Sequence, residues 1–183
     1  MFTGALAASY YGTPRTTMDI DLVAKVGRGE PRTKLISALK VVGLEVDRRK
    51  IDAALRSGYG IVTLRDTKTP FTVDIILSNK RLEKNAGSIL GLPTFYQTPE
   101  GLILAKLRMI KATFPRERAL KDENDVRAIL RHTSVKMNAL RKQAQKDNTM
   151  SILRAIASSD PRKPSSQVRL TGQYATHPQH HTY

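Results

Sequence analysis

The chain has 183 residues, a formal net charge of +15 and a pI near 10.3, so we expect polyanionic partners, nucleic acid first among them. Cysteine is absent, which excludes a disulfide framework, thiolate catalysis and zinc–thiolate sites. No apolar run approaches the roughly 20 residues that span a membrane, so we expect a cytoplasmic protein with no membrane partner. Periodicity then divides the chain into a mixed α/β half (1–97), a helical half (98–157) and a basic tail (158–183) expected to be disordered.

The mixed half is predicted to combine short helices with three or more strands. Apolar spacing and Gly or Pro stops favour helices over 4–11, 31–40 and 47–55, and strands over 17–25, 60–65 and 71–77. The last two strands form a hairpin or an antiparallel pair. A short helix and loop over 79–92 and a short strand over 93–97 complete this half.

The helical half begins with a strong start signal. Thr98 is the expected cap, Pro99 occupies the first helical position and Glu100 lies in the first turn, which predicts a helix to about residue 112. Further helices are expected over 121–131, 134–146 and 149–157. A cleft between the two halves is a natural place for a substrate.

Two strands carry acids that share a sheet with apolar residues. Because side chains alternate along a strand, Asp19 and Asp21 lie on one face and Met18, Ile20 and Leu22 on the other. Asp74 is a third strand acid, set among apolar neighbours. Carboxylates that repel one another are most readily kept around a cation, so this pattern predicts a site for Mg²⁺ or Mn²⁺. The alternative is a surface strand with exposed acids.

Two features near these acids suit a phosphate group. The Gly4-Ala5 turn opens a helix whose N-terminal amides favour an anion, and Arg15 could contact a phosphate through two nitrogens. The alternative interpretation of the first feature is an ordinary helix start. His177, His180 and His181 are too loosely spaced to predict a functional metal site.

Lys106 is predicted to lie inside an apolar helical stripe. At about 100° per residue it falls in the same arc as Leu102, Leu107 and Ile110. An ammonium group there needs an anion, either a phosphate or one of the three strand acids, unless its stem covers apolar surface and its head reaches water.

Asp122 and Asp125 are further candidate site acids. Asp122 falls on the Val126 and Ile129 face of its helix, and Asp125 flanks it. Favourable placement of acids in a first helical turn is an equally good explanation.

The order of these segments resembles the nucleotidyltransferase superfamily typified by DNA polymerase β, especially minimal nucleotidyltransferases and the abortive-infection toxin enzymes of bacteria and archaea. The resemblance rests on Gly4-Ala5, thirteen intervening residues and Asp19-Ile20-Asp21. It extends through Thr-Pro-Glu-Gly-Leu-Ile-Leu-Ala-Lys-Leu and Lys-Asp-Glu-Asn-Asp-Val-Arg-Ala-Ile-Leu, and together the matches cover about residues 2–157.

This resemblance implies an α/β (α+β) nucleotidyltransferase fold, a mixed twisted sheet flanked by helices and followed by a helical half. It implies transfer of a nucleoside monophosphate from a nucleoside triphosphate with two magnesium (or manganese) ions. By motif position, Asp19, Asp21 and Asp74 would hold metal, and Gly4 and Ala5 would lie against the triphosphate. The remaining nucleotide-binding and catalytic positions would be Arg15, Thr16, Lys106, Asp122 and Asp125.

The sequence departs from the family pattern twice. Ala5 replaces a Gly or Ser, which removes a hydroxyl contact. Family members usually carry a helix and a strand before Gly4, where this chain has only Met1-Phe2-Thr3. We therefore expect a shortened reading frame whose sheet lacks a strand, with little ahead of Gly4 to fix its position.

We expect a metal-dependent nucleotidyltransferase in which Asp74 activates the acceptor hydroxyl while Arg15 and Lys106 neutralise phosphate charge. The net charge favours an RNA acceptor such as tRNA. The main variant is a protein acceptor in a toxin–antitoxin pair, with a cognate toxin or antitoxin as partner. Two other classes stay open: a degenerate member that binds nucleic acid or protein without catalysis, and a metal-dependent phosphohydrolase.

Overall fold

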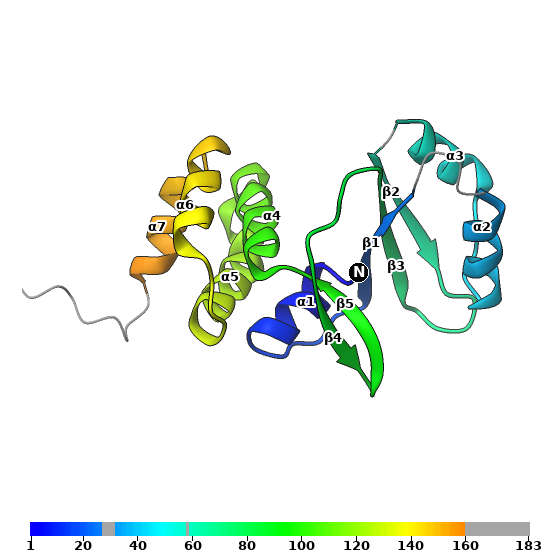
Figure 1. The fold of residues 1–183 in the computed structure, drawn as a ribbon, viewed down its shortest axis with the longest axis horizontal. Coiled ribbons are helices and arrows are strands. Elements are labelled where there is room, and N and C mark those ends of the chain that lie inside the picture. The colour runs from blue at the N-terminus through cyan, green and yellow to red at the C-terminus, as the bar shows by residue number, and fades with distance from the viewer. Residues whose placement is uncertain (27–31, 58, 160–183) are drawn as a thin grey trace, which may run out of the picture.

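A computed structural model describes residues 1–26, 32–57 and 59–159 of the chain (Figure 1). Helices and strands alternate in the first part, and helices alone form the last part, as the sequence predicts. In chain order the elements are α1 (Gly4–Tyr11), β1 (Asp19–Lys25), α2 (Arg32–Val41), α3 (Arg48–Ser57), β2 (Tyr59–Arg65), β3 (Thr72–Ser78), β4 (Lys84–Ile89), β5 (Leu92–Gln97), α4 (Pro99–Ala112), η1 (Arg116–Ala119), α5 (Leu120–His132), α6 (Met137–Lys146) and α7 (Met150–Ser158).

The main sheet has three strands in the order β1-β3-β2. β1 runs parallel to β3, and β2 runs antiparallel to β3, so the sheet is mixed and the predicted antiparallel pair is confirmed. A separate hairpin is formed by β4 and β5. The chain is therefore an α+β protein, which confirms the fold class at this level.

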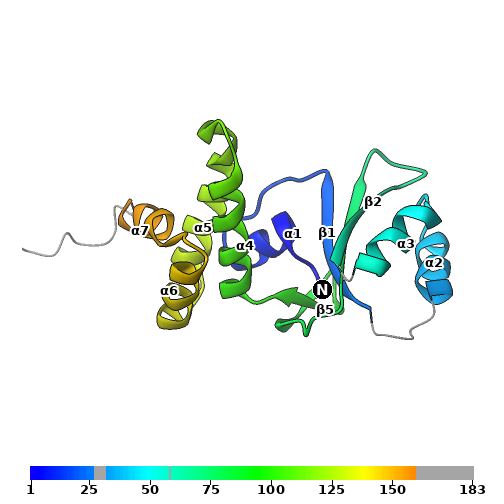
Figure 2. The same ribbon diagram turned by 90° about the horizontal axis from the view of Figure 1, so that it is seen from above.

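Helices α2 and α3 cover one face of the main sheet (Figures 1 and 2). The core between them consists of side chains that alternate along the strands with polar ones. Its buried members include Ile36, Ile51, Val62, Leu64, Ile75 and Leu77. Because these residues fill one face, the alternate positions that carry the acids project from the opposite face, toward α1 and α4 (Figure 2).

A second core lies within the helical part and includes α1. Leu102, Ile103 and Leu107 of α4 pack with Val126 and Ile129 of α5, all at 1% exposure or less. Ala7, Ala8 and Tyr11 of α1 and Tyr96 of β5 join the same cluster. Helix α1 therefore belongs to the helical core, although it precedes the first strand of the sheet.

Residues 1–3 connect the two sheets, which corrects the expectation that little fixes the position of Gly4. Phe2 donates from its backbone nitrogen to Phe95 O at 2.8 Å and accepts from Gln97 N at 2.9 Å. On the other side, Thr3 N donates to Asp21 O at 3.0 Å. This short extended segment is held between β1 and β5, and it fixes the entry to α1.

The prediction for residues 79–92 was wrong. In place of a helix, Lys84–Ile89 forms β4, which pairs with β5 across a turn at Leu90 and Gly91, both with positive φ. β1 also begins at Asp19 rather than at residue 17, because the Thr17 hydroxyl accepts a hydrogen bond from the Asp19 amide at 3.2 Å. Such a local turn competes with strand pairing.

The predicted helices of the second half are confirmed within three residues at each end. The Thr98 hydroxyl accepts from Gly101 N at 3.3 Å, and Pro99 is the first residue of α4. Residues 160–183 of the predicted tail, with His177, His180 and His181, lie outside the described residues. In the described ranges, no helix is both long and apolar enough to cross a membrane.

Candidate active site

The three strand acids share one face of the main sheet. Asp19 and Asp21 are two residues apart on β1, and Asp21 is the register partner of Asp74 on the adjacent β3. Neighbouring strands lie about 4.8 Å apart, so Asp21 and Asp74 are direct neighbours across the sheet. Asp19 is exposed, whereas Asp21 and Asp74 are half-buried. The predicted grouping of acids on one face is therefore confirmed.

Threonines on the neighbouring strands hold two of these carboxylates. The Thr72 hydroxyl donates to Asp19 at 2.5 Å, and the Thr63 hydroxyl donates to Asp74 at 2.6 Å. In both cases the threonine is the register partner of the acid. Neither threonine was predicted as a site residue, although alternation along 59–65 and 72–78 places both on the acid-bearing face.

The start of α1 lies against Asp21. Gly4 has φ +56°, and a Cβ at that position would lie 1.9 Å from Oδ2 of Asp21, so only glycine fits here. The backbone amide of Ala5 donates a hydrogen bond to the Asp21 carboxylate. The predicted helix N-terminus therefore faces an anion, and in this structure that anion is the carboxylate of Asp21.

The surroundings of Asp21 disfavour its negative charge. Burial raises the pKa of its carboxyl above the ordinary value, and the charges of Asp74 and then Asp19 raise it further. The Ala5 hydrogen bond and the Lys106 ammonium act in the opposite direction and lower that pKa. The net rise in this pKa therefore comes first from burial and second from the neighbouring acids.

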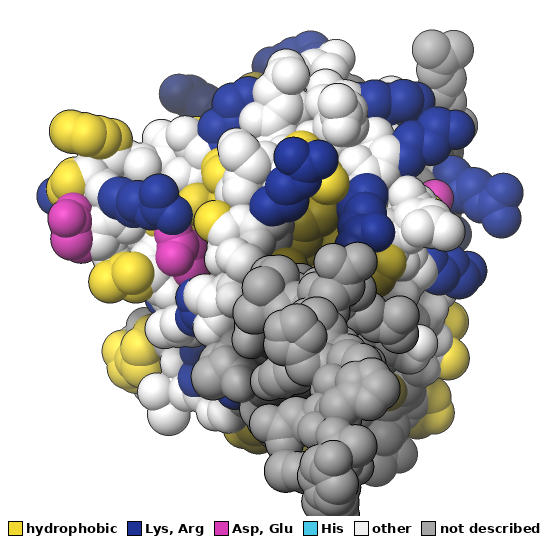
Figure 3. All heavy atoms as spheres, turned by 90° about the vertical axis from the view of Figure 1, so that its left-hand side faces the viewer, with side chains coloured by type: hydrophobic (Ala, Val, Ile, Leu, Met, Phe, Trp, Pro, Cys, Tyr) yellow, Lys and Arg dark blue, Asp and Glu magenta, His cyan; other side chains and the backbone are white. Residues whose placement is uncertain are grey.

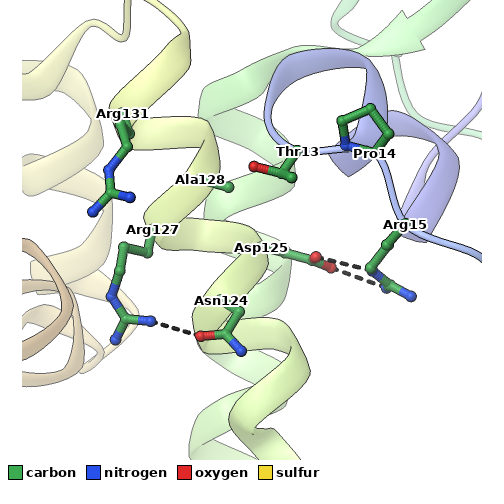
Figure 4. A pocket seen from close by; sticks show the side chains of 8 residues that line it. All are labelled: Thr13, Pro14, Arg15, Asn124, Asp125, Arg127, Ala128 and Arg131. Atoms are coloured by element: carbon green, nitrogen blue, oxygen red, sulfur yellow. Dashed lines mark hydrogen bonds and ion pairs between the residues drawn. The ribbon is translucent and has the colours of Figure 1, made fainter.

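A buried ion cluster joins α4, α5 and the loop before β1. Lys106 Nζ lies 2.9 Å from Asp122 Oδ1 and 2.7 Å from Asp125 Oδ2. Asp125 also binds Arg15 through two bonds, Nε to Oδ1 at 2.9 Å and Nη2 to Oδ2 at 3.0 Å. Figure 4 shows Asp125 reaching from α5 to Arg15. The Asp125 hydrogen bond is the main cause of the raised pKa of Arg15.

This cluster changes two expectations from the sequence. Lys106 does need an anion, because its side chain is only 7% exposed, but the partners are Asp122 and Asp125 rather than a phosphate or a strand acid. Asp122 and Asp125 are thus not simply first-turn acids. Arg15, with a side chain 31% exposed, is paired with Asp125 and still reaches the surface.

Two cavities flank the site. One, of about 320 Å³, lies between α5 and residues 13–15 and is lined by Arg15, Asn124, Arg127 and others (Figure 4). The other, of about 420 Å³, lies between the acid-bearing face of the sheet and α4. The second cavity has walls from both halves of the chain, which confirms the predicted cleft between them.

The remaining predicted residue, Thr16, is exposed in the loop before β1, and its side chain makes no hydrogen bond within the described ranges. Across residues 1–26, 32–57 and 59–159, no three or more His, Asp or Glu side chains lie close enough together to hold a metal ion as a group. Asp21 and Asp74 are therefore the acids best placed to act as a pair, with Asp19 beside them.

No protein-family model matches the sequence, and a search of curated proteins finds no significant match.

Proposed function

We propose that this protein is a metal-dependent nucleotidyltransferase with the nucleotidyltransferase fold. The observation that supports it best is the meeting of three acids on one sheet face with the N-terminus of a helix, at Asp21. The acids provide hard oxygen ligands for a divalent cation, and the helix start provides a positive potential for phosphate oxygens.

The donor set fits Mg²⁺ or Mn²⁺. Mg²⁺ is usually held by one or two carboxylates, with water and substrate phosphate completing its shell, so the pair Asp21 and Asp74 is sufficient. Burial is the main cause of the raised pKa of Asp21, and the charges of Asp74 and Asp19, which a cation would offset, raise that pKa further. Asp21 and Asp74, with Asp19 beside them, would hold such an ion, which would supply positive charge to offset that of the triphosphate and of the attacking oxygen.

The residues of the chain then have distinct tasks in the transfer. The acceptor hydroxyl oxygen forms a bond to the α-phosphorus of the triphosphate, the α–β anhydride bond breaks and pyrophosphate leaves. Asp74, which keeps one carboxylate oxygen on Thr63, takes the proton of the hydroxyl with the other. Gly4 and Ala5 position the phosphates at the start of α1.

Arg15 and Lys106 act differently because their burial differs. The partly exposed Arg15 can contact a phosphate while Asp125 holds its guanidinium in place. The buried Lys106 acts through its charge, which already lowers the pKa of Asp21, and it is positioned by Asp122 and Asp125.

Surface charge supports an RNA acceptor such as tRNA. Figure 3, which looks onto the α6–α7 end, shows Lys and Arg side chains recurring over the upper part of that face. Exposed members on these helices include Arg141, Lys142, Lys146 and Arg154. Such a surface attracts a phosphate backbone in a salt-dependent way. A protein acceptor, in a toxin–antitoxin pair, is the variant that the acceptor assay distinguishes.

A second candidate is a degenerate member of the same family that binds RNA without catalysis. The observation in its favour is that Ala5 provides no hydroxyl and its amide is already bonded to Asp21. In this case a triphosphate with Mg²⁺ would leave the melting temperature unchanged, while RNA would still bind.

The test is transfer of label from each α-labelled nucleoside triphosphate, with Mg²⁺, to total RNA or to lysate protein. We expect Asp74→Asn to lower transfer by roughly 10²–10⁴-fold, the usual contribution of a general base. Asp66→Asn is the matched control, because Asp66 is also held by a threonine, Thr69, but lies in the β2–β3 turn. Transfer that survives Asp19→Asn combined with Asp21→Asn contradicts the proposal. Release of phosphate without a labelled acceptor indicates a phosphohydrolase instead.

A further inference from the structure

The cavity of about 420 Å³ adjoins the acids on the same face of the sheet. Its floor includes Val23 and Ile76, which follow Asp21 and Asp74 by two residues and so project from the same face. Its opposite wall is α4, where Gly101, Ala105 and Arg108 recur at helical spacing. A ligand on this floor would therefore lie roughly 7 Å, or two strand residues, from the Asp21–Asp74 pair along the same face of the sheet.

The lining combines an apolar floor with a fixed polar group. Val23, Ile76 and Ala105 offer apolar surface suited to a flat ring. Gln97 projects at the cavity with its Oε1 engaged by the Thr3 hydroxyl, which leaves its amide nitrogen as a hydrogen-bond donor. A volume of this size lies in the roughly 300–1,000 Å³ range of small-ligand sites.

Positive charge surrounds the mouth of this cavity. Lys80 and Arg81 are exposed lining residues, and neither forms an ion pair within the described residues. Arg108 adds a guanidinium that is 53% exposed but is paired with Asp147. Against these cations the lining holds one acid, Glu83. Lys80 and Arg81 are therefore available to an anionic group at the mouth when the cavity is occupied.

We propose that this cavity holds the 3′-terminal nucleotide of a single-stranded nucleic-acid acceptor, with its base on the apolar floor and its 5′ phosphate on Lys80 and Arg81. The inference rests on the proposed function, in which Asp74 receives the proton of the acceptor hydroxyl. The nucleoside of the triphosphate fits less well, because its phosphates are directed toward the acids and leave Lys80 and Arg81 without an anion. A protein acceptor brings no phosphate to these cations.

Binding of a fluorescent, random-sequence oligoribonucleotide tests the proposal without requiring catalysis. We expect Ala105→Phe, which fills the cavity, to weaken RNA binding by at least about tenfold while the affinity for the triphosphate with Mg²⁺ stays the same. Ala112→Phe is the matched control, because Ala112 is exposed at the end of the same helix. Weakened triphosphate binding with unchanged RNA binding would overturn the inference and leave the proposed function standing.

Two further measurements test the role of the Lys80 and Arg81 charges and the position of the 3′ end of the oligonucleotide. Lys80→Ala combined with Arg81→Ala, exposed positions that spare the fold, should lower the slope of log affinity against log salt by about 0.7, the contribution of one single-strand phosphate contact, because both cations bind the same 5′ phosphate. Lys40→Ala with Arg56→Ala, on α2 and α3, should leave the slope unchanged. An oligonucleotide with a 3′ phosphate should bind more weakly than one with a 3′ hydroxyl, because its charge faces Asp74. Equal affinity for the two ends, or an unchanged slope, contradicts the proposal.

Parallel measurements with DNA and RNA of one sequence identify the source of the acceptor. If one of the two oligonucleotides, DNA or RNA, binds more tightly, the result supports the proposal that the cavity is a nucleic-acid site and identifies the preferred type of acceptor. If only lysate protein receives label and neither strand binds, the inference is wrong while the transferase proposal stands. If neither label transfer nor triphosphate binding occurs but Ala105→Phe still weakens RNA binding, the proposed function fails and the cavity remains an RNA site.

Discussion

At the scale of single residues, Gly4 and Asp21 are the most tightly constrained pair in the site. Gly4 combines φ +56° with a carboxylate where its Cβ would lie. Asp21 is at once a strand residue, a neighbour of two acids and the hydrogen-bond acceptor for the first turn of α1. A change at either position therefore alters helix and sheet together.

We expect Gly4→Ala to destabilise the protein more than Gly91→Ala does. Gly91 also has a positive φ, +80°, but nothing lies within 4 Å of its Cβ position, so its substitution costs only the backbone strain of about 1–2 kcal/mol. At Gly4 the carboxylate must also move off the Ala5 amide, which adds at least about 1 kcal/mol. Urea denaturation measures both; equal losses would show that the Asp21 contact contributes nothing.

The raised pKa of Asp21 predicts a pH dependence of stability. Between the unfolded value of 3.8 and the higher folded value, the folded state binds more protons than the unfolded state, so stability falls as pH rises. The Asp21→Asn variant has no titrating group at this position. Its free energy of unfolding, compared with that of the wild type, should therefore increase as pH rises above 3.8. Denaturation across a pH series, without divalent cations, measures the difference. A difference that is independent of pH would contradict the assignment.

At the scale of elements, the ion cluster is the main polar connection between α4 and α5. We expect Lys106→Met, which keeps the apolar stem, to cost about 3–5 kcal/mol, because Asp122 and Asp125 lose the cation that lies between them. Arg108→Met on the same helix is the control. The Arg108 side chain is 53% exposed, and an ion pair at the surface contributes about 0–1 kcal/mol. Similar losses for the two variants would contradict this account.

Local signals predicted some elements well and failed for others. The Thr98 cap and Pro99 define the start of α4 from adjacent residues alone, and the prediction there was right. Lys84–Ile89 contains Asn, Ala, Gly and Ser, which have weak strand preference, and it becomes a strand only by pairing with β5. The apolar stripe showed that Lys106 needs an anion. It could not show which one, since Asp122 lies sixteen residues away on another helix.

At the scale of the whole molecule, the site lies between two separate hydrophobic cores. One core joins the main sheet to α2 and α3, and the other joins α1 to the later helices. Residues 1–3 link them through backbone bonds to β1 and β5. A substrate held between the sheet and α4 would contact both halves, so its binding should stabilise both.

We expect the two cores to respond separately to mutation. Ile51→Ala, at 1% exposure, should cost about 2–5 kcal/mol and lower hydrogen-exchange protection in β2 and β3 while α5 and α6 stay protected. Ile129→Ala, fully buried in α5, should produce the reverse pattern. Loss of protection throughout the molecule in both variants would show one cooperative unit instead.

The bond between the Ala5 amide and Asp21 also affects how inactive variants should be interpreted. In a random mutagenesis screen, substitutions of Asp21 by side chains that cannot accept a hydrogen bond will reduce protein abundance as well as activity, because they leave the Ala5 amide at the start of α1 without its acceptor. Position 74 lacks that second task, since Thr63 is its hydrogen-bond partner on β2. Variants that keep normal abundance but lose function should therefore be found at Asp74 more often than at Asp21.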